Sequence, residues 1–210
     1  MTPSLRDLRA RFERATIAAG ATQSGAAAFE KLVDRYGEAQ RHYHTLTHVD
    51  ACLAWLDWFC GLAERPEEVE LALWFHDAIY DAQGSDSERR SANLAREQLA
   101  ELGVASSIID VIVRHIEGTE RHVATGGDSA LVVDLDLAIL AAPPRDFDHF
   151  EEQIRKEYCH VPDPLYRAGR RRVLEGFLSR SEIYRVAQIR EELEGRSRVN
   201  LARRVSELIG

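Results

Sequence analysis

The chain has 210 residues, of which 45% are apolar, and a formal net charge of −8 at pH 7. This negative balance argues against nonspecific binding to nucleic-acid polymers or to anionic lipid. No apolar run reaches the roughly 20 residues that a membrane-spanning helix needs. The charged N-terminus lacks the apolar core of a signal peptide, and the three cysteines show no Cys-x-x-Cys spacing. We therefore expect a cytoplasmic protein with reduced thiols.

Apolar residues recur at helical spacing, and almost no segment alternates apolar and polar residues as a strand would. Glycines, prolines and capping residues mark the breaks. The sequence therefore predicts an all-α fold, and no linker divides residues 1–210, so we expect a single domain. Helices are expected at about residues 5–19, 26–36, 47–60, 66–81, 86–102, 106–117, 128–142, 146–159, 163–180 and 182–209.

His76 and Asp77 stand side by side in an apolar segment, residues 71–80, of the helix that is expected to start at Pro66. Burying an imidazole and a carboxylate costs several kcal/mol unless a partner compensates them. A divalent cation compensates both, because imidazole nitrogen and carboxylate oxygen are good metal ligands. The alternative from this segment alone is a hydrogen-bonded His–Asp pair at the edge of a core.

Other ligand types lie on both sides of this pair. Upstream, Thr47 is expected to cap a helix that has His48 in its first turn, with His44 just before it. Downstream, the apolar run of residues 131–140 carries Asp134 and Asp136. Such residues can converge on one ion of Zn, Mn, Fe, Co or Ni and leave positions open for water.

These motifs resemble those of HD-superfamily metal-dependent phosphohydrolases, in particular a subgroup of predicted HD phosphohydrolases of about this length. The resemblance covers roughly residues 30–205. The matching segments are Tyr43-His44-Thr45 with His48, and residues 73–81, 87–92, 134–140, 154–158 and 198–201.

The resemblance implies an HD-domain-like helical bundle. Its metal-site core would span about residues 40–140, with C-terminal helices at about 146–209 packed on it. It also implies a divalent-metal site made by His48, His76, Asp77 and a late aspartate. The resemblance places that last ligand at Asp136, with Asp134 as the alternative.

Several polar residues are weaker candidates near such a site. His44 is expected to contact substrate, or to be a ligand or a surface residue. His122 lies in a Thr-x-x-His pattern similar to one of the subgroup and is a candidate catalytic residue, ahead of His115. Glu88 is a candidate substrate contact, or simply a first-turn glutamate favoured by the helix dipole. Asp81 lies four residues after Asp77 and would share its face if the helix persists, where it could orient a histidine or the attacking water.

Arginines in the C-terminal third offer a phosphate clamp. Arg155 and Arg170 are candidate substrate-binding residues, because guanidinium geometry suits phosphate oxygens. The alternative is a solvated basic stripe, or pairing with glutamates such as Glu151, Glu157 and Glu175.

Taken together, the sequence predicts a phosphohydrolase in which a metal-activated water attacks a small phosphorylated molecule, for which a nucleotide is the first choice. Asp77 is expected both to bind metal and to accept a proton. The ion would be Mn, Zn, Fe, Co, Ni or Mg. The alternatives are an HD-fold ligand sensor without turnover and a purely structural helical protein. No nucleic-acid polymer or membrane partner is expected, and a homodimer formed through an apolar helix face stays open.

Overall fold

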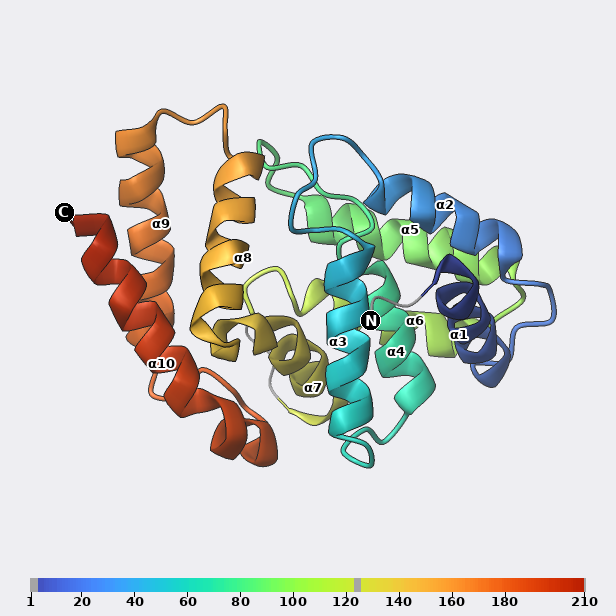
Figure 1. Ribbon diagram of the computed structural model, residues 1–210. Coiled ribbons are helices and arrows are strands. Elements are labelled where there is room, and N and C mark those ends of the chain that lie inside the picture. The colour runs from blue at the N-terminus through green and yellow to red at the C-terminus, as the bar shows by residue number, and fades with distance from the viewer. Residues whose placement is uncertain (1–3, 123–125, 210) are drawn as a thin grey trace. The chain divides into compact units, whose positions relative to one another are not determined.

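A computed structural model describes residues 4–122 and 126–209, and within these ranges the protein contains helices and no strands (Figure 1). The predicted all-α fold is therefore confirmed. The chain divides into two compact units, residues 1–136 and 137–210. The expectation that the C-terminal helices pack on the metal-site core stays a prediction. No helix in the described ranges is both long enough and apolar enough to cross a membrane.

The first unit is built around α4. Its helices are α1 (Leu5–Ala18), α2 (Ala26–Tyr36), α3 (Leu46–Trp58), α4 (Pro66–Phe75), α5 (Ser87–Glu101), α6 (Ser106–Glu117) and α7 (Gly127–Asp136). The α4 helix packs against α1, α3, α5, α6 and α7. It can do so because its last five residues, Leu71–Phe75, are all apolar and fully buried. A helix that is hydrophobic all round belongs in the centre of a bundle.

Aromatic side chains of α1 and α2 pack against those of this central helix. The ring of Phe12 in α1 lies 5.6 Å from that of Trp74 and 6.0 Å from those of Phe75 and Phe29, the last of which comes from α2. Each of these side chains is at most 2% exposed.

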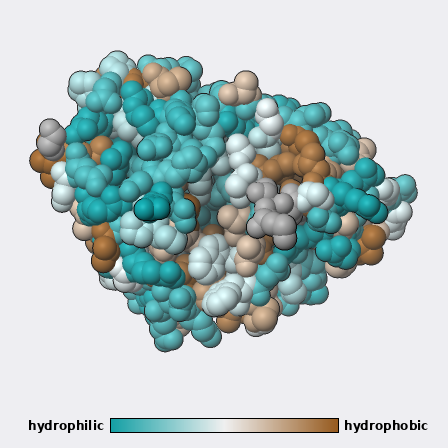
Figure 2. All heavy atoms as spheres, in the orientation of Figure 1, coloured by the Kyte–Doolittle hydropathy of each residue, from teal (hydrophilic) through white to brown (hydrophobic). Residues whose placement is uncertain are grey.

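On the face shown in Figure 2, hydrophilic residues predominate and hydrophobic residues form small groups.

Two helix ends differ from the sequence prediction. The α3 helix is capped by Thr45, whose side chain accepts a hydrogen bond from the backbone N–H of Thr47, so the predicted cap at Thr47 is wrong by two residues. The α4 helix ends at Phe75 and does not continue to residue 81. His76 is its C-terminal cap, and Asp77 lies in the turn that follows. The pair therefore stands at the end of a buried helix, where the chain can expose one side of it.

The segment that leads into α4 is bound by a distant residue. The carboxylate of Asp128, at the beginning of α7, accepts hydrogen bonds from the backbone N–H groups of Glu64 and Arg65 at 2.9 and 2.8 Å. Free N–H groups around a helix start require such acceptors. This contact ties the beginning of α7 to the beginning of α4, and it thereby constrains where Asp136 stands relative to His76.

The second unit contains the 3₁₀ helix η1 (Leu137–Ala141), α8 (Pro144–Glu157), α9 (Asp163–Leu178) and α10 (Ala187–Ile209). Polar side chains of α10 bind the ends of neighbouring segments. Asn200 donates to the carbonyl oxygens of Leu140 and Ala142, each at 2.9 Å, and Arg198 donates to those of Leu178 and Arg180. The late segment at residues 198–201 is thus structural within this unit.

Candidate metal centre

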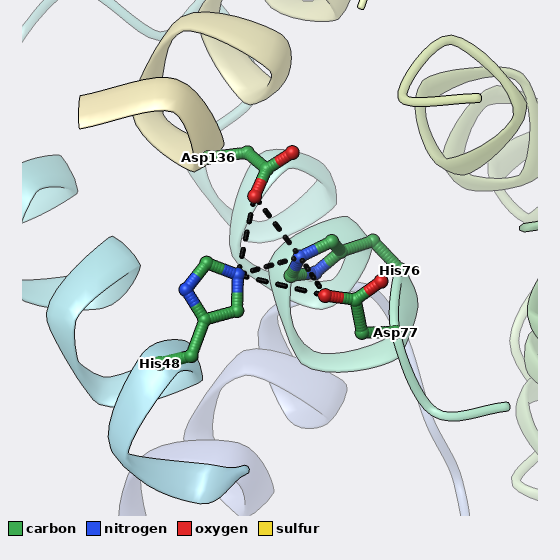
Figure 3. A group of neighbouring side chains, drawn as sticks. All are labelled: His48, His76, Asp77 and Asp136. Carbon is green, nitrogen blue, oxygen red and sulfur yellow. Dashed lines mark hydrogen bonds and ion pairs between the residues drawn. The ribbon is translucent and has the colours of Figure 1, made fainter. Parts of the chain in front are cut away.

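Four side chains that lie far apart in the sequence meet in the first unit: His48, His76, Asp77 and Asp136 (Figure 3). One ligand atom from each lies within 4.8 Å of the others. The two histidine Nε2 atoms are 3.1 Å apart. Nε2 of His48 lies 3.1 Å from Oδ1 of Asp136 and 3.6 Å from Oδ2 of Asp77. Nε2 of His76 lies 3.5 Å from Oδ1 of Asp136 and 3.1 Å from Oδ2 of Asp77.

Each ligand is placed by a helix end. His48 is the third residue of α3, which starts after the Thr45 cap. His76 and Asp77 follow the last residue of α4, and Asp136 is the last residue of α7. Asp134, two residues earlier on α7, is fully buried and does not belong to this group. The structure therefore brings Asp136 to the cluster, the first of the two alternatives considered.

The cluster is rich in atoms that accept hydrogen bonds. Nδ1 of His76 lies 2.9 Å from the carbonyl oxygen of Leu73, so this nitrogen carries the proton and donates it. In a neutral His76 the Nε2 atom is then an acceptor, and it faces two carboxylate oxygens and Nε2 of His48. Acceptors at such distances repel one another unless protons or a cation lie between them.

The distances fit a shared cation. Two ligands bound at about 2.1 Å to one ion lie ~3.0 Å apart at octahedral angles and ~3.4 Å apart at tetrahedral angles. Five of the six separations in the cluster are between 3.1 and 3.6 Å. Two imidazoles and two carboxylates form a ligand set that suits Zn, Mn, Fe, Co or Ni. The group can therefore hold a metal ion.

The ionisation of the cluster in the absence of an ion reflects the same crowding. Burial alone would lower the pKa of His76, but the carboxylates of Asp77 and Asp136 together outweigh it and raise that pKa well above its usual value. Burial would likewise raise the pKa values of Asp77 and Asp136. Their histidine neighbours, chiefly His76 for Asp77 and His122 for Asp136, hold both below the usual range. Without an ion, the carboxylates therefore favour a protonated His76, and the histidines favour ionised carboxylates.

The carboxylates form the accessible side of the cluster. The side chains of His48 and His76 are 3% and 1% exposed, whereas those of Asp77 and Asp136 are 15% and 12% exposed. The carboxylates are therefore the more solvent-exposed ligands, while the imidazoles lie in the protein interior.

His122 supports the cluster from outside. Its Nε2 lies 3.3 Å from Oδ2 of Asp136, the carboxylate oxygen that does not face His48. A carboxylate that is held through its second oxygen keeps its first oxygen oriented. His122 adopts a left-handed backbone conformation with φ of 48°, which is uncommon outside glycine. The structure thus brings this candidate to the site as a neighbour of Asp136.

His44 also lies beside the cluster. Its ring stacks on that of Tyr80 at 4.0 Å between centroids, and it is 6.0 Å from the ring of His48. Its electrostatic influence helps to lower the pKa of Asp77, after that of His76. His44 is therefore a neighbour of Asp77 and is not one of the four converging side chains.

Glu88, in the first turn of α5, is half-buried near the same carboxylates. Burial raises its pKa, and the charges of Asp77 and Glu120 raise it further.

Asp81 does not share a helix face with Asp77, because α4 ends at Phe75. Its side chain is exposed in a turn and accepts a hydrogen bond from the backbone N–H of Gln83. The predicted role of Asp81, to orient a histidine or the attacking water, required the helix to continue past Asp77, and the helix does not continue.

Arg155 and Arg170 belong to the second unit. Arg170 donates to Glu151, a carboxylate whose side chain is 2% exposed, so the predicted alternative of pairing with Glu151 is what the structure shows. Arg155 donates to the carbonyl oxygens of Tyr158 and Val161. Both guanidinium groups have partners within their own unit, and their binding of a substrate stays a prediction.

His115 is buried in α6, and its Nδ1 lies 2.7 Å from the hydroxyl of Ser129. It is not part of the cluster of four.

One residue that sequence reasoning did not single out is Arg41, whose buried guanidinium contacts the backbone at Asp77. Its signal was present in the sequence only as an arginine three residues before His44.

Comparison with known proteins gives no match among family models, curated proteins or solved structures. The structure itself shows helices throughout the described part of the chain and a His/Asp group that could hold a metal ion, an arrangement compatible with an HD-type bundle.

Proposed function

We propose that this protein is a metal-dependent phosphohydrolase of the HD type that acts on a small phosphorylated molecule. The observation that carries the proposal is the convergence of His48, His76, Asp77 and Asp136 at ligand distances from one another. The order and spacing of the motifs in the sequence, which resemble those of HD phosphohydrolases, support the choice of a phosphoester as the substrate.

The four side chains would hold one divalent ion. When bound, such an ion would polarise a phosphoryl oxygen and lower the pKa of water toward ~7. The protein would supply the rest of the chemistry. Asp77 is adjacent to His76 and partly exposed, so its carboxylate would accept a proton from the attacking water. His122 would keep Asp136 in its orientation through Oδ2.

The substrate would lie on the carboxylate side, the accessible one. His44 and Glu88 would border it there, since His44 lies beside His48 and the charges of Asp77 and Glu88 influence each other. Because this rim combines an imidazole with a carboxylate, it suits a ligand that carries both a phosphate and hydrogen-bonding hydroxyl groups. A nucleotide has both features and is the first class to test.

The test is a panel of mono-, di- and cyclic nucleotides assayed with Mn²⁺, Co²⁺ and Mg²⁺, preceded by elemental analysis of the purified protein. We expect turnover that is lost in His76→Ala and Asp77→Asn. The matched control is His149→Ala, because His149 is an exposed histidine of α8 that pairs only locally with Glu152. Its variant should keep full activity.

Two results would count against the proposal. Stabilisation by a nucleotide without release of phosphate would favour a ligand-sensing protein. A purified chain that contains no metal and takes up none would favour a structural helical protein.

A further inference from the structure

Arg41 lies between α2 and α3, and its side chain is completely buried. Its Nη1 donates to two carbonyl oxygens, that of His44 at 3.1 Å and that of Asp77 at 2.6 Å. Its Nη2 donates to the carbonyl oxygen of Ala78 at 2.9 Å. One planar group therefore joins two chain segments that are more than thirty residues apart and that lead into the metal-ligand cluster.

The carbonyl groups at the end of α4 need donors from elsewhere, because a helix leaves its last carbonyls without partners. Side chains of three other segments supply them. Tyr36 donates to the carbonyl oxygen of Trp74, Ser91 donates to that of Ile79, and Arg41 donates to those of the two residues that follow His76. Of these three side chains, Arg41 also binds the segment that leads into α3, because it donates to the carbonyl oxygen of His44.

The guanidinium is itself held in place. Its Nε donates to the Glu38 carboxylate at 3.2 Å, and the rings of Tyr36 and Tyr80 lie 5.2 and 5.8 Å from its central carbon. A buried cation is costly unless its donors are used, and here Nε, Nη1 and Nη2 all have acceptors. A planar fork in a fixed orientation defines the distance between the groups that it bridges, which a flexible ammonium does not.

We propose that Arg41 is a positioning residue of the metal centre. Its guanidinium sets the spacing between the start of α3, which carries His48, and the turn that carries His76 and Asp77. The inference rests on the proposed function only in requiring that the cluster bind a divalent ion, and it does not require turnover.

The test compares Arg41→Lys with Arg11→Lys. Arg11 is a matched control because its guanidinium also ties helices together, from α1 to Asp57 of α3 and Glu70 of α4. Its contacts on α3 are with Asp57 and with the carbonyl oxygen of Leu53, nine and five residues after His48, and on α4 it binds the residue six positions before His76. The readouts are the affinity for Co²⁺ by calorimetric titration, the absorption spectrum of bound Co²⁺, and the melting temperature of the metal-free protein.

We expect Arg41→Lys to weaken Co²⁺ binding about 10- to 100-fold and to change the spectrum, as substitution of residues behind metal ligands does. Arg11→Lys should lower the melting temperature and leave the affinity within about twofold, because the two sites do not share partners. Wild-type affinity and spectrum in Arg41→Lys would overturn the proposal, as would an equal loss of affinity in Arg11→Lys.

A second variant keeps the test valid if Arg41→Lys does not fold. Glu38→Ala removes only the partly exposed carboxylate that orients the guanidinium, and we expect a smaller loss of affinity in the same direction. A wild-type protein that binds Co²⁺ but hydrolyses nothing would contradict the proposed phosphohydrolase function and leave the positioning role of Arg41 intact. A wild-type protein that binds no divalent ion would contradict both proposals.

Discussion

Lowering the pH should weaken metal binding, because an ion must displace a proton from His76. Burial opposes the charged form of this imidazole, but the carboxylates of Asp77 and Asp136 together raise its pKa well above the usual value, so His76 carries a proton at neutral pH in the metal-free protein. Since Nδ1 donates to Leu73, the proton that has to leave is the one on Nε2, the atom that faces the cluster. Metal ligands must be deprotonated to bind.

The magnitude follows from this single proton. Below the pKa of His76, each pH unit should change the dissociation constant about tenfold, or about 1.4 kcal/mol. Asp77 and Asp136 have lowered pKa values, so they do not contribute to the pH dependence of the dissociation constant between pH 5.5 and 7.5. With free metal at about 100 times the dissociation constant at pH 7.5, binding should stabilise the fold by about 2.7 kcal/mol, and this gain should fall to about 0.4 kcal/mol at pH 5.5. At roughly 2–4 °C per kcal/mol, the metal-induced rise in melting temperature should shrink from about 5–10 °C to about 1 °C.

The metal-free protein should respond in the opposite direction. The pKa of His76 is raised in the folded state, so its contribution to stability is fully present below its unfolded pKa of about 6.5. That contribution is lost as the pH rises through the folded pKa. Raising the pH above about 6.5 should therefore destabilise the metal-free protein and strengthen metal binding at the same time.

Calorimetric titration with Mn²⁺ or Zn²⁺ in two buffers of different ionisation enthalpy measures the number of protons released. About one proton per ion is expected at pH 7. Melting curves with and without metal at pH 5.5, 6.5 and 7.5 provide the second measurement. A dissociation constant that is the same at pH 5.5 and 7.5, or binding without proton release, would refute this account of the cluster.

Three further outcomes are expected. His122→Ala should keep the fold and bind metal about 10- to 100-fold more weakly in titrations, because Asp136 loses the partner of its second oxygen. Glu151→Ala should destabilise the protein by about 3 kcal/mol in urea unfolding, because it leaves two guanidinium groups without their buried carboxylate; unchanged stability would contradict this reading. Gly103→Ala should cost more than about 1 kcal/mol in the same assay, because φ is +82° and the new Cβ would collide with Thr22.

The sequence predicts most helices because they depend on local patterns, whereas the four residues of the cluster are what the resemblance to a known family implies. Apolar spacing and prolines or glycines marked α2 and α6 to the residue. The cap of α3 was misplaced because Thr45 and Thr47 are equally good capping residues, and only the path of the preceding loop selects between them. The predicted extension of α4 past His76 failed for a related reason. Apolar residues continue through residue 80, while the donors that end the helix come from elsewhere in the chain.

The choice between Asp134 and Asp136 shows what single-sequence reasoning lacks. Both aspartates lie in one apolar run, and residues two apart on a helix point in different directions. Which of them reaches His48 depends on the rotation of α7 and its position along α4. The contact of Asp128 with the segment that leads into α4 constrains that position, and it joins residues more than sixty apart in the sequence. No local pattern contains this information.

The same reasoning explains why the ligands stand at helix ends. Side chains in the middle of a packed helix are surrounded by apolar neighbours, whereas at an end the backbone itself has free groups that polar residues must satisfy. Thr45, Asp128 and Arg41 satisfy them at the start of α3, the start of α4 and the turn after α4. All three residues contact backbone, and each holds a segment that carries a ligand or adjoins one. The geometry of the cluster is therefore determined as much by the residues that cap the helices as by the histidines and aspartates that form it.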